Sequence, residues 1–286
     1  WGEGWQRAFG EKSGTKLARC SIWAVCVWAI LLGRGTHVEG REESQWTELE
    51  GPGFVILSDA PVREMENFAL VYSAFYHAFQ RLFEEDIARL PRSTLVLFAS
   101  ERSFRDHLAV KSSFDGKTVG FSIEVDGAPI SVFSIAGNRE RALQVALESE
   151  AMWATGRLGY FTPIWMTQGV GQVLSTTEIE SGSYRLAKDT RGFSAQLKTT
   201  FWLPWSRFLD FHVRSKEYGS GGVYHAQSWG LMHWILFKDD QGPRRFKQLA
   251  ERLRTHSALE AVQEVMNEHP DRFKEVIEDH LRRTSK

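Results

Sequence analysis

The side chains that could do chemistry lie in two short segments of the C-terminal half. Leu147–Trp153 reads LESEAMW and contains the carboxylate of Glu150, and Pro163–Gly169 reads PIWMTQG and contains the amide of Gln168. A carboxylate can act as a general base or accept hydrogen bonds, and an amide nitrogen can donate them. We expect the two segments to lie on two facing helices, with the Gln168 amide donating a hydrogen bond to the Glu150 carboxylate.

Glu150 falls on the apolar face of its predicted helix. The apolar residues of that face are Leu143, Ala146, Leu147, Ala151 and Ala154. A carboxylate buried among them is costly unless it is paired or protonated. Two interpretations stay open: Glu150 accepts hydrogen bonds inside a pocket, or it is a partly solvated helix residue.

These segments resemble the peptidase MA-like family of gluzincin zinc metallopeptidases, a family catalogued as a domain of unknown function. In that family one helix carries His-Glu-x-x-His and a following helix carries Trp-Leu-x-Glu-Gly. Three further stretches are similar to the family: Phe54–Pro61 (FVILSDAP), Ser93–Ala99 (STLVLFA) and Tyr224–Leu236 (YHAQSWGLMHWIL). The resemblance extends from Trp46 to Arg283.

The resemblance implies that the metal ligands have been replaced. The family's two histidines fall at Ser149 and Trp153, its glutamate ligand falls at Gln168, and only the general base is kept, as Glu150. In the family pattern both histidines reach one zinc, which lowers the pKa of its bound water from about 15.7 to about 7. A hydroxyl, an indole N–H and an uncharged amide cannot hold Zn²⁺ tightly. We therefore expect no cofactor, with the zinc site lost.

The resemblance also gives roles to three aromatic residues. Trp153 is expected to fill the former metal space, and Trp165 to pack the two helices together. Tyr224 falls where related gluzincins place a tyrosine that stabilises the transition state, and without zinc we interpret it as a structural survivor.

Other candidate sites are less favoured by residue spacing. His225 and His233 lie about 80° apart in helical projection, and with His212 they could form a replacement metal site; satisfied or surface histidines are the simpler interpretation. Ser149 has no histidine close in sequence to activate it as a nucleophile. Gly219–Gly222 follows no strand, so it is interpreted as a loop.

The elements that must position these residues form two blocks. The first contains strands at 54–58, 93–99, 118–124 and 130–135, with a hairpin turn at Asp126-Gly127, a helix from 61 to about 85 and a short helix at 100–107 capped by Ser100. From Asn138 onward the pattern is helical, with helices at 139–155, 163–175, 195–214, 224–239, 243–256, 259–268 and 270–283. These patterns predict an α+β fold, with a small mixed α/β subdomain at 41–137 and a mainly helical subdomain at 138–286. The resemblance implies that the second is zincin-like (thermolysin-like).

The N-terminal residues look like a targeting segment. Cys20–Gly33 contains no charge and follows Lys12, Lys16 and Arg19. This length is short for a bilayer span, which needs about 20 residues, but it is typical of a secretory signal. We expect residues 1–40 to be a signal peptide or an N-terminal membrane anchor; a buried helix is the alternative. The protein would then be exported: periplasmic, secreted or membrane-anchored.

Composition excludes several classes of protein. Formal net charge is −1, which gives no basic footprint for nucleic acid. The only cysteines are Cys20 and Cys26, so the rest of the chain has neither a disulfide framework nor a cysteine zinc site. Hydrophobic residues make up 42% of the chain, which is enough to build a large core.

Three functions are compatible with these observations. The first is an exported pseudopeptidase of the bacterial envelope, whose old cleft between the α/β and helical parts binds a peptide along a strand edge. The second is an active hydrolase with a non-standard site that retains Glu150. The third is a structural envelope protein. The expected partners are a peptide or an envelope protein, with membrane contact only through the N-terminal segment.

Overall fold

The computed structural model describes residues 46–84, 90–107, 120–157, 163–176, 178–180, 183–185, 187–189, 192–210 and 222–284. The predicted targeting segment at 1–40 lies outside the described residues, as do Cys20, Cys26 and His212. Within the described ranges, no helix is both long enough and apolar enough to cross a bilayer.

The chain folds into two compact units. Unit 1 contains the described residues up to Ser73 together with those of Pro91–Ala146, and unit 2 contains those of Ala74–Leu90 together with those of Leu147–Lys286. Two long helices, α3 (Val62–Phe83) and α5 (Arg139–Arg157), therefore contribute residues to both units.

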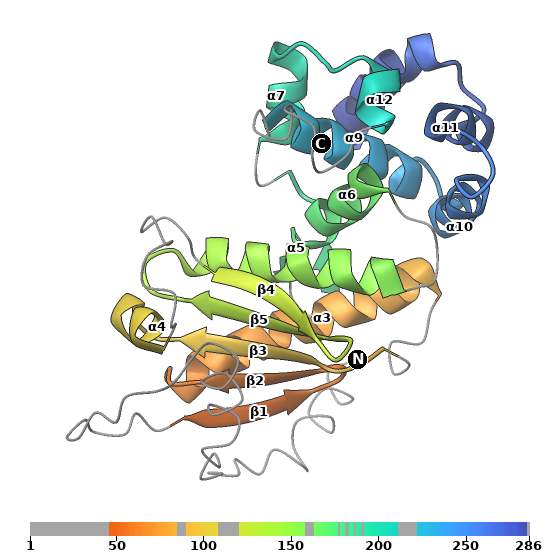
Figure 1. The fold of residues 1–286 in the computed structure, drawn as a ribbon. Coiled ribbons are helices and arrows are strands. Elements are labelled where there is room, and N and C mark those ends of the chain that lie inside the picture. The colour runs from red at the N-terminus through yellow and green to blue at the C-terminus, as the bar shows by residue number, and fades with distance from the viewer. Residues whose placement is uncertain are drawn as a thin grey trace. The chain divides into compact units, whose positions relative to one another are not determined.

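Unit 1 is built around a five-stranded sheet (Figure 1). Its strands are β1 (Thr47–Gly51), β2 (Phe54–Ser58), β3 (Ser93–Phe98), β4 (Gly120–Val125) and β5 (Ala128–Ser134). Their order is β1-β2-β3-β5-β4, in which β2, β3 and β5 run parallel and the edge strands β1 and β4 pair antiparallel to their neighbours. Alternate residues of β2 are buried, as expected for a strand with one face on a core.

Local signals placed most elements of unit 1 correctly. Asp126 and Gly127 have φ values of 51° and 81°. They form the left-handed pair that a tight β4–β5 hairpin requires. The backbone N–H of Ser103 donates to the Oγ of Ser100 over 3.0 Å at the start of α4 (Glu101–His107), as expected for a capping serine. The strand β1 was not predicted, because its sequence, TELEG, has little of the apolar alternation of a buried strand.

The helix α3 carries an aromatic stripe along its buried face. In unit 1 the ring of Tyr72 meets that of Phe54 on β2 edge-on, with centroids 5.5 Å apart. In unit 2 the rings of Phe75, Phe79 and Phe83 follow one another, and the ring of Phe83 lies 4.6 Å from that of Phe246. One amphipathic helix thus contributes to the cores of both units.

Unit 2 is mainly helical and also contains a small hairpin. Its helices, besides its parts of α3 and α5, are α6 (Ile164–Leu174), α7 (Phe193–Thr199), α8 (Trp205–Leu209), α9 (Gly222–Phe237), α10 (Gly242–Arg252), α11 (Ala258–Met266) and α12 (Phe273–Thr284), with a 3₁₀ turn at Pro270–Arg272. The hairpin pairs β6 (Glu178–Glu180) with β7 (Ser183–Arg185). Helix α9 packs against α6, α7, α10 and α12, and it is buried on nearly all sides.

The sequence prediction for this part needs three corrections. The single helix expected at 195–214 is two helices, α7 and α8, because Pro204 cannot continue a helix and forces the preceding residue into an extended conformation. Helix α5 includes Gly156, which was expected to follow its end. The β6–β7 hairpin was not predicted. The predicted fold class, α+β, is confirmed: a small sheet is followed by a mostly helical region.

Candidate functional site

Two glycines allow α6 to pack closely against helices on two of its sides. A Cβ added to Gly169 would lie 2.5 Å from the carbonyl oxygen of Ser228 on α9. A Cβ added to Gly171 would lie 2.9 Å from the carbonyl oxygen of Glu148 on α5. Both distances are shorter than ordinary van der Waals contacts, so these positions have no room for a side chain. The polar residues of α6 are thereby held close to those of α5 and α9.

Glu150 is buried and receives a hydrogen bond from a tyrosine. Its exposed fraction is 1%, so the interpretation as a partly solvated residue is wrong. The hydroxyl of Tyr76, on the part of α3 that belongs to unit 2, donates to Oε1 of Glu150 over 2.6 Å. This short hydrogen bond offsets part of the unfavourable free energy of burying a carboxylate.

Gln168 bonds to a different glutamate from the one predicted. Its Nε2 donates to Oε1 of Glu148 rather than to Glu150. The reason is helix geometry, because residues two apart on a helix point about 200° apart in projection. Helix α6 approaches α5 on the side of Glu148. Sequence reasoning identified the two facing helices correctly but chose the wrong carboxylate.

The other two expected ligand positions are half-buried. Ser149 and Trp153 lie on α5, and the guanidinium of Arg157 lies 5.9 Å from the centre of the Trp153 ring. The indole N–H of Trp153 is shielded from solvent and has no hydrogen-bond partner in the described part of the chain. That Trp153 fills a former metal space stays a prediction.

A second polar pair, missed by sequence reasoning, joins α6 to α9. The side-chain nitrogen of Gln172 lies 2.9 Å from Nδ1 of His225, and Gln172 is fully buried. The available signal was spacing, because Gln168 and Gln172 lie four residues apart on one helix face. Tyr224, next to His225, is 1% exposed and its ring packs against that of Phe208, with centroids 5.3 Å apart.

We call this set of side chains the polar seam of unit 2. Its members are Tyr76, Glu148, Glu150, Gln168, Gln172 and His225. The described contacts join a carboxylate to a phenol, a carboxylate to an amide and an amide to an imidazole. Such contacts suit buried polar groups that hold helices in register.

The histidines of α9 do not converge on one point. Nδ1 of His233 lies 2.8 Å from Nε2 of His280 on α12, whereas His225 contacts Gln172. Burial lowers the pKa of His233 to about 3, and burial also lowers the pKa of His280 to about 4. Over the ranges that the structure describes, no three His, Cys, Asp or Glu side chains are grouped so as to hold a metal ion.

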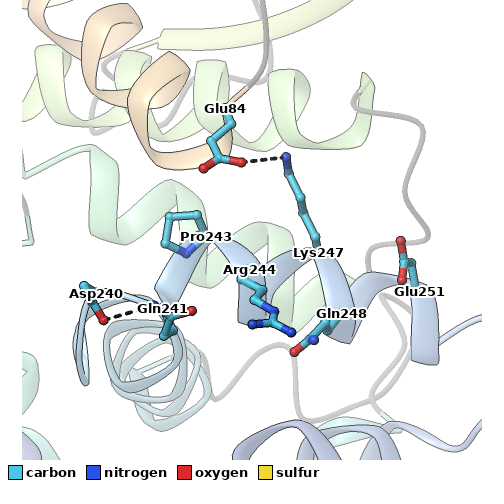
Figure 2. Close-up of a pocket in the computed structure, with 8 residues that line it drawn as sticks. All are labelled: Glu84, Asp240, Gln241, Pro243, Arg244, Lys247, Gln248 and Glu251. Carbon is cyan, nitrogen blue, oxygen red and sulfur yellow. Dashed lines mark hydrogen bonds and ion pairs between the residues drawn. The ribbon is translucent and has the colours of Figure 1, made fainter.

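A polar hollow of about 470 Å³ lies at the start of α10 (Figure 2). It is lined by Glu84, Asp240, Gln241, Pro243, Arg244, Lys247, Gln248 and Glu251. The ammonium of Lys247 points toward the carboxylate of Glu84 and pairs with it at 3.3 Å. The lining contains both signs of charge and none of the residues of the polar seam, so it is separate from the site that the sequence predicted.

Comparison with known proteins adds no assignment to this geometry. No protein-family model matches the chain, and no curated protein is significantly similar to it.

Proposed function

We propose that this protein is a non-catalytic relative of the gluzincin metallopeptidases, exported from the cell and using the zincin-like scaffold for binding or for structure. The observation that carries the proposal is the state of Glu150. This residue is the general base in the resemblance, and its carboxylate is buried and bonded to the hydroxyl of Tyr76. A general base has to reach a water molecule that attacks the substrate, and burial of this kind opposes that role.

The chemistry of the three replaced positions supports the same proposal. Ser149 offers a neutral hydroxyl, Trp153 an indole N–H and Gln168 an amide. The amide nitrogen of Gln168 donates to Glu148, and an uncharged amide is a poor ligand for Zn²⁺. A water molecule near Glu150 would keep its ordinary pKa without a metal ion to lower it.

The proposal is tested by restoring the ligands. The triple variant Ser149→His, Trp153→His, Gln168→Glu should bind one zinc ion per chain, measured by elemental analysis after dialysis against trace zinc. The matched control is Ser149→Ala, Trp153→Ala, Gln168→Ala, which should bind none. A triple variant that folds, as judged by circular dichroism, and yet binds no zinc would contradict the resemblance.

Activity of the unaltered protein is the second arm of the test. We expect no peptide hydrolysis above the rate of the Glu150→Gln variant, measured with a mixed fluorogenic peptide library. Zinc bound by the unaltered protein together with hydrolysis that Glu150→Gln abolishes would overturn the proposal and make the protein an active hydrolase.

A further inference from the structure

Helix α12 buries three apolar side chains and one histidine. Its buried residues are Phe273, Ile277, His280 and Leu281, which follow the spacing of a single helix face. The helix packs against α9 and α7. A Cβ added to Gly230 of α9 would lie 3.4 Å from Cγ2 of Ile277 and 3.8 Å from Cδ1 of Leu281. Apolar packing therefore holds α12 in place, with one titratable group on its buried face.

The imidazole of His280 meets a second histidine in this interface. Its Nε2 lies 2.8 Å from Nδ1 of His233 on α9, and the two residues are 3% and 7% exposed. One proton is held between these nitrogens, because one neutral imidazole donates its N–H to the lone pair of the other. A further proton on the pair buries a positive charge, and a proton on every ring nitrogen turns two N–H groups toward each other.

The charges around His280 oppose a further proton. The cations that act on it come from three helices or their ends: Lys238 after α9, Arg245 on α10 and Arg283 on α12. Asp239 and Asp279 pair with two of these cations. Burial, with smaller contributions from the cations, still lowers the pKa of His280 to about 4.

The charges around His233 compensate a proton only in part. Asp189, which precedes α7, favours the charged form of His233, and so does a backbone carbonyl at Ala187. The carboxylate of Asp189 already accepts hydrogen bonds from the backbone N–H groups of Phe193 and Ser194 at the start of α7. In the part of the chain that the structure describes, neither imidazole of the pair has a carboxylate within ion-pair distance. The only charged residue of α7 itself, Lys198, is exposed.

A hollow of about 210 Å³ lies beside the interface between α9 and α12. It is lined by Trp234 of α9 and Val276 of α12, together with six charged residues: Lys238, Arg272, Arg283, Glu268, Glu275 and Asp279. Water in this hollow reaches the edge of the interface. The carboxylates of the hollow are a second group of titratable side chains beside α12, so an experiment has to separate them from the histidines.

The segment that leads into α12 has the properties of a hinge. Asn267 ends α11 in a left-handed conformation, with φ 51°, and Pro270 begins the 3₁₀ turn before α12. Hinges are formed by a few such residues at the ends of elements. His269 lies between them, and its side chain is 64% exposed.

We propose that the contact between His233 and His280 makes the docking of α12 sensitive to acid: protons taken up by the two imidazoles favour an open state in which α12 has left α9 and α7 while the other helices of unit 2 stay folded. In the open state both imidazoles reach water and titrate near pH 6.5. In the closed state they take up protons only near pH 3 and pH 4. Acid therefore stabilises the open state. The inference is independent of the proposed function, because it uses none of the residues of the polar seam.

Native-state hydrogen exchange of the full chain, measured by mass spectrometry at low urea concentrations, tests the proposal. From pH 7.0 to 5.5 the opening constant of α12 should rise by about eightfold for each histidine, and so by up to about 70-fold, after correction for intrinsic exchange rates. At pH 5.5 the amides of α12 should be less protected than those of α6 and should depend less on urea, as expected for local opening. If α12 and α6 have equal protection and equal urea dependence at pH 5.5, or if the opening constant of α12 does not rise, the proposal is overturned.

Substitution of the two histidines separates their effect from that of the carboxylates. His233→Gln, His280→Gln keeps two polar side chains that take up no proton, and the opening constant of α12 should change by less than about twofold between the two pH values. His269→Gln is the matched control for an exposed histidine and should keep the full increase. A double variant that keeps the full increase overturns the proposal and assigns the effect to Glu268, Glu275 and Asp279. If circular dichroism shows that the double variant does not fold, His280→Gln replaces it, and the increase should fall to about eightfold; an unchanged increase then overturns the proposal.

Discussion

The hydrogen bond between Tyr76 and Glu150 shows how a carboxylate is accommodated in the helical unit. Glu150 is 1% exposed and Tyr76 is 2% exposed, so neither can exchange its partner for bulk water. When one partner of a buried pair is removed, the other stays buried without a hydrogen bond. This costs about 1–3 kcal/mol, and more for a charged group.

Tyr76→Phe removes only the hydroxyl and should therefore destabilise the protein by about 1–3 kcal/mol, measured by urea unfolding at neutral pH. Glu150→Leu, made alone and in the Tyr76→Phe background, completes a double-mutant cycle, because leucine, unlike glutamine, has no oxygen to accept the hydrogen bond. We expect a coupling energy that is clearly different from zero; additive effects of the two substitutions would show that the hydrogen bond contributes nothing to stability.

The sequence could place Glu150 on the apolar face of its helix, but it could not predict the partner of its carboxylate. Tyr76 lies 74 positions earlier in the chain, and nothing in local spacing connects the two. The choice between Glu148 and Glu150 as the partner of Gln168 depends on the rotation of α5 against α6. That rotation is set by tertiary packing at Gly171, which residue types alone do not reveal.

The close packing of α6 against α9 predicts that a side chain added at Gly169 destabilises the protein. Gly169→Ala would place a Cβ 2.5 Å from the backbone carbonyl oxygen of Ser228, and a backbone atom cannot move aside as a flexible side chain can. Overpacking of this kind costs about 1–3 kcal/mol. We expect a loss of that size, measured by thermal or urea unfolding.

Gly156→Ala on α5 is the matched control, because a Cβ at Gly156 has no neighbouring atom within 4 Å. Alanine is the better helix former, so this variant should be more stable by up to about 1 kcal/mol. If both substitutions stabilise the protein, the helices α6 and α9 do not pack as closely as described.

Elements with strong local signals were predicted and elements without them were missed. Capping by Ser100 and the Asp126-Gly127 turn mark their boundaries through local hydrogen bonds and backbone conformations. The strand β1 is polar because it lies at an edge, and the β6–β7 hairpin has strands too short for a period to emerge. Pro204 separates α7 from α8, although the helical spacing of apolar residues continues on both sides of it.

For the whole molecule, the buried pair of His233 and His280 predicts how stability depends on pH. Burial, reinforced by the charge of His280, lowers the pKa of His233 to about 3, and burial, with smaller contributions from nearby cations, lowers that of His280 to about 4. In the unfolded chain both groups titrate near pH 6.5. Between these values the unfolded state binds more protons than the folded state, so stability rises with pH.

The contribution of the two histidines to the free energy of unfolding is fully present above about pH 6.5. It is lost as the pH falls toward 4 and then 3. Each histidine adds a slope of up to about 1.4 kcal/mol per pH unit. Urea unfolding at pH 7.0, 5.5 and 4.5, followed by circular dichroism, measures this slope.

The double variant His233→Leu, His280→Leu should lose most of this pH dependence, since it has no buried group left to protonate there. His269→Leu is the control for replacing a histidine outside the core, because this side chain is 64% exposed. If the free energy of unfolding of the double variant has the same slope with pH as that of the unaltered protein, other groups cause the sensitivity to acid.

The division of α3 between the two units has a consequence for synthesis on the ribosome. Residues 74–90 belong to unit 2 but are translated in the middle of unit 1. Glu84 and its partner Lys247 are 163 positions apart in the sequence, and Phe83 and Phe246 are separated by the same number of positions. At about 5–20 residues per second the delay is roughly ten seconds or more. Throughout that interval the phenylalanines of α3 that await unit 2 are an exposed apolar stripe, which suits a chaperone that binds nascent chains.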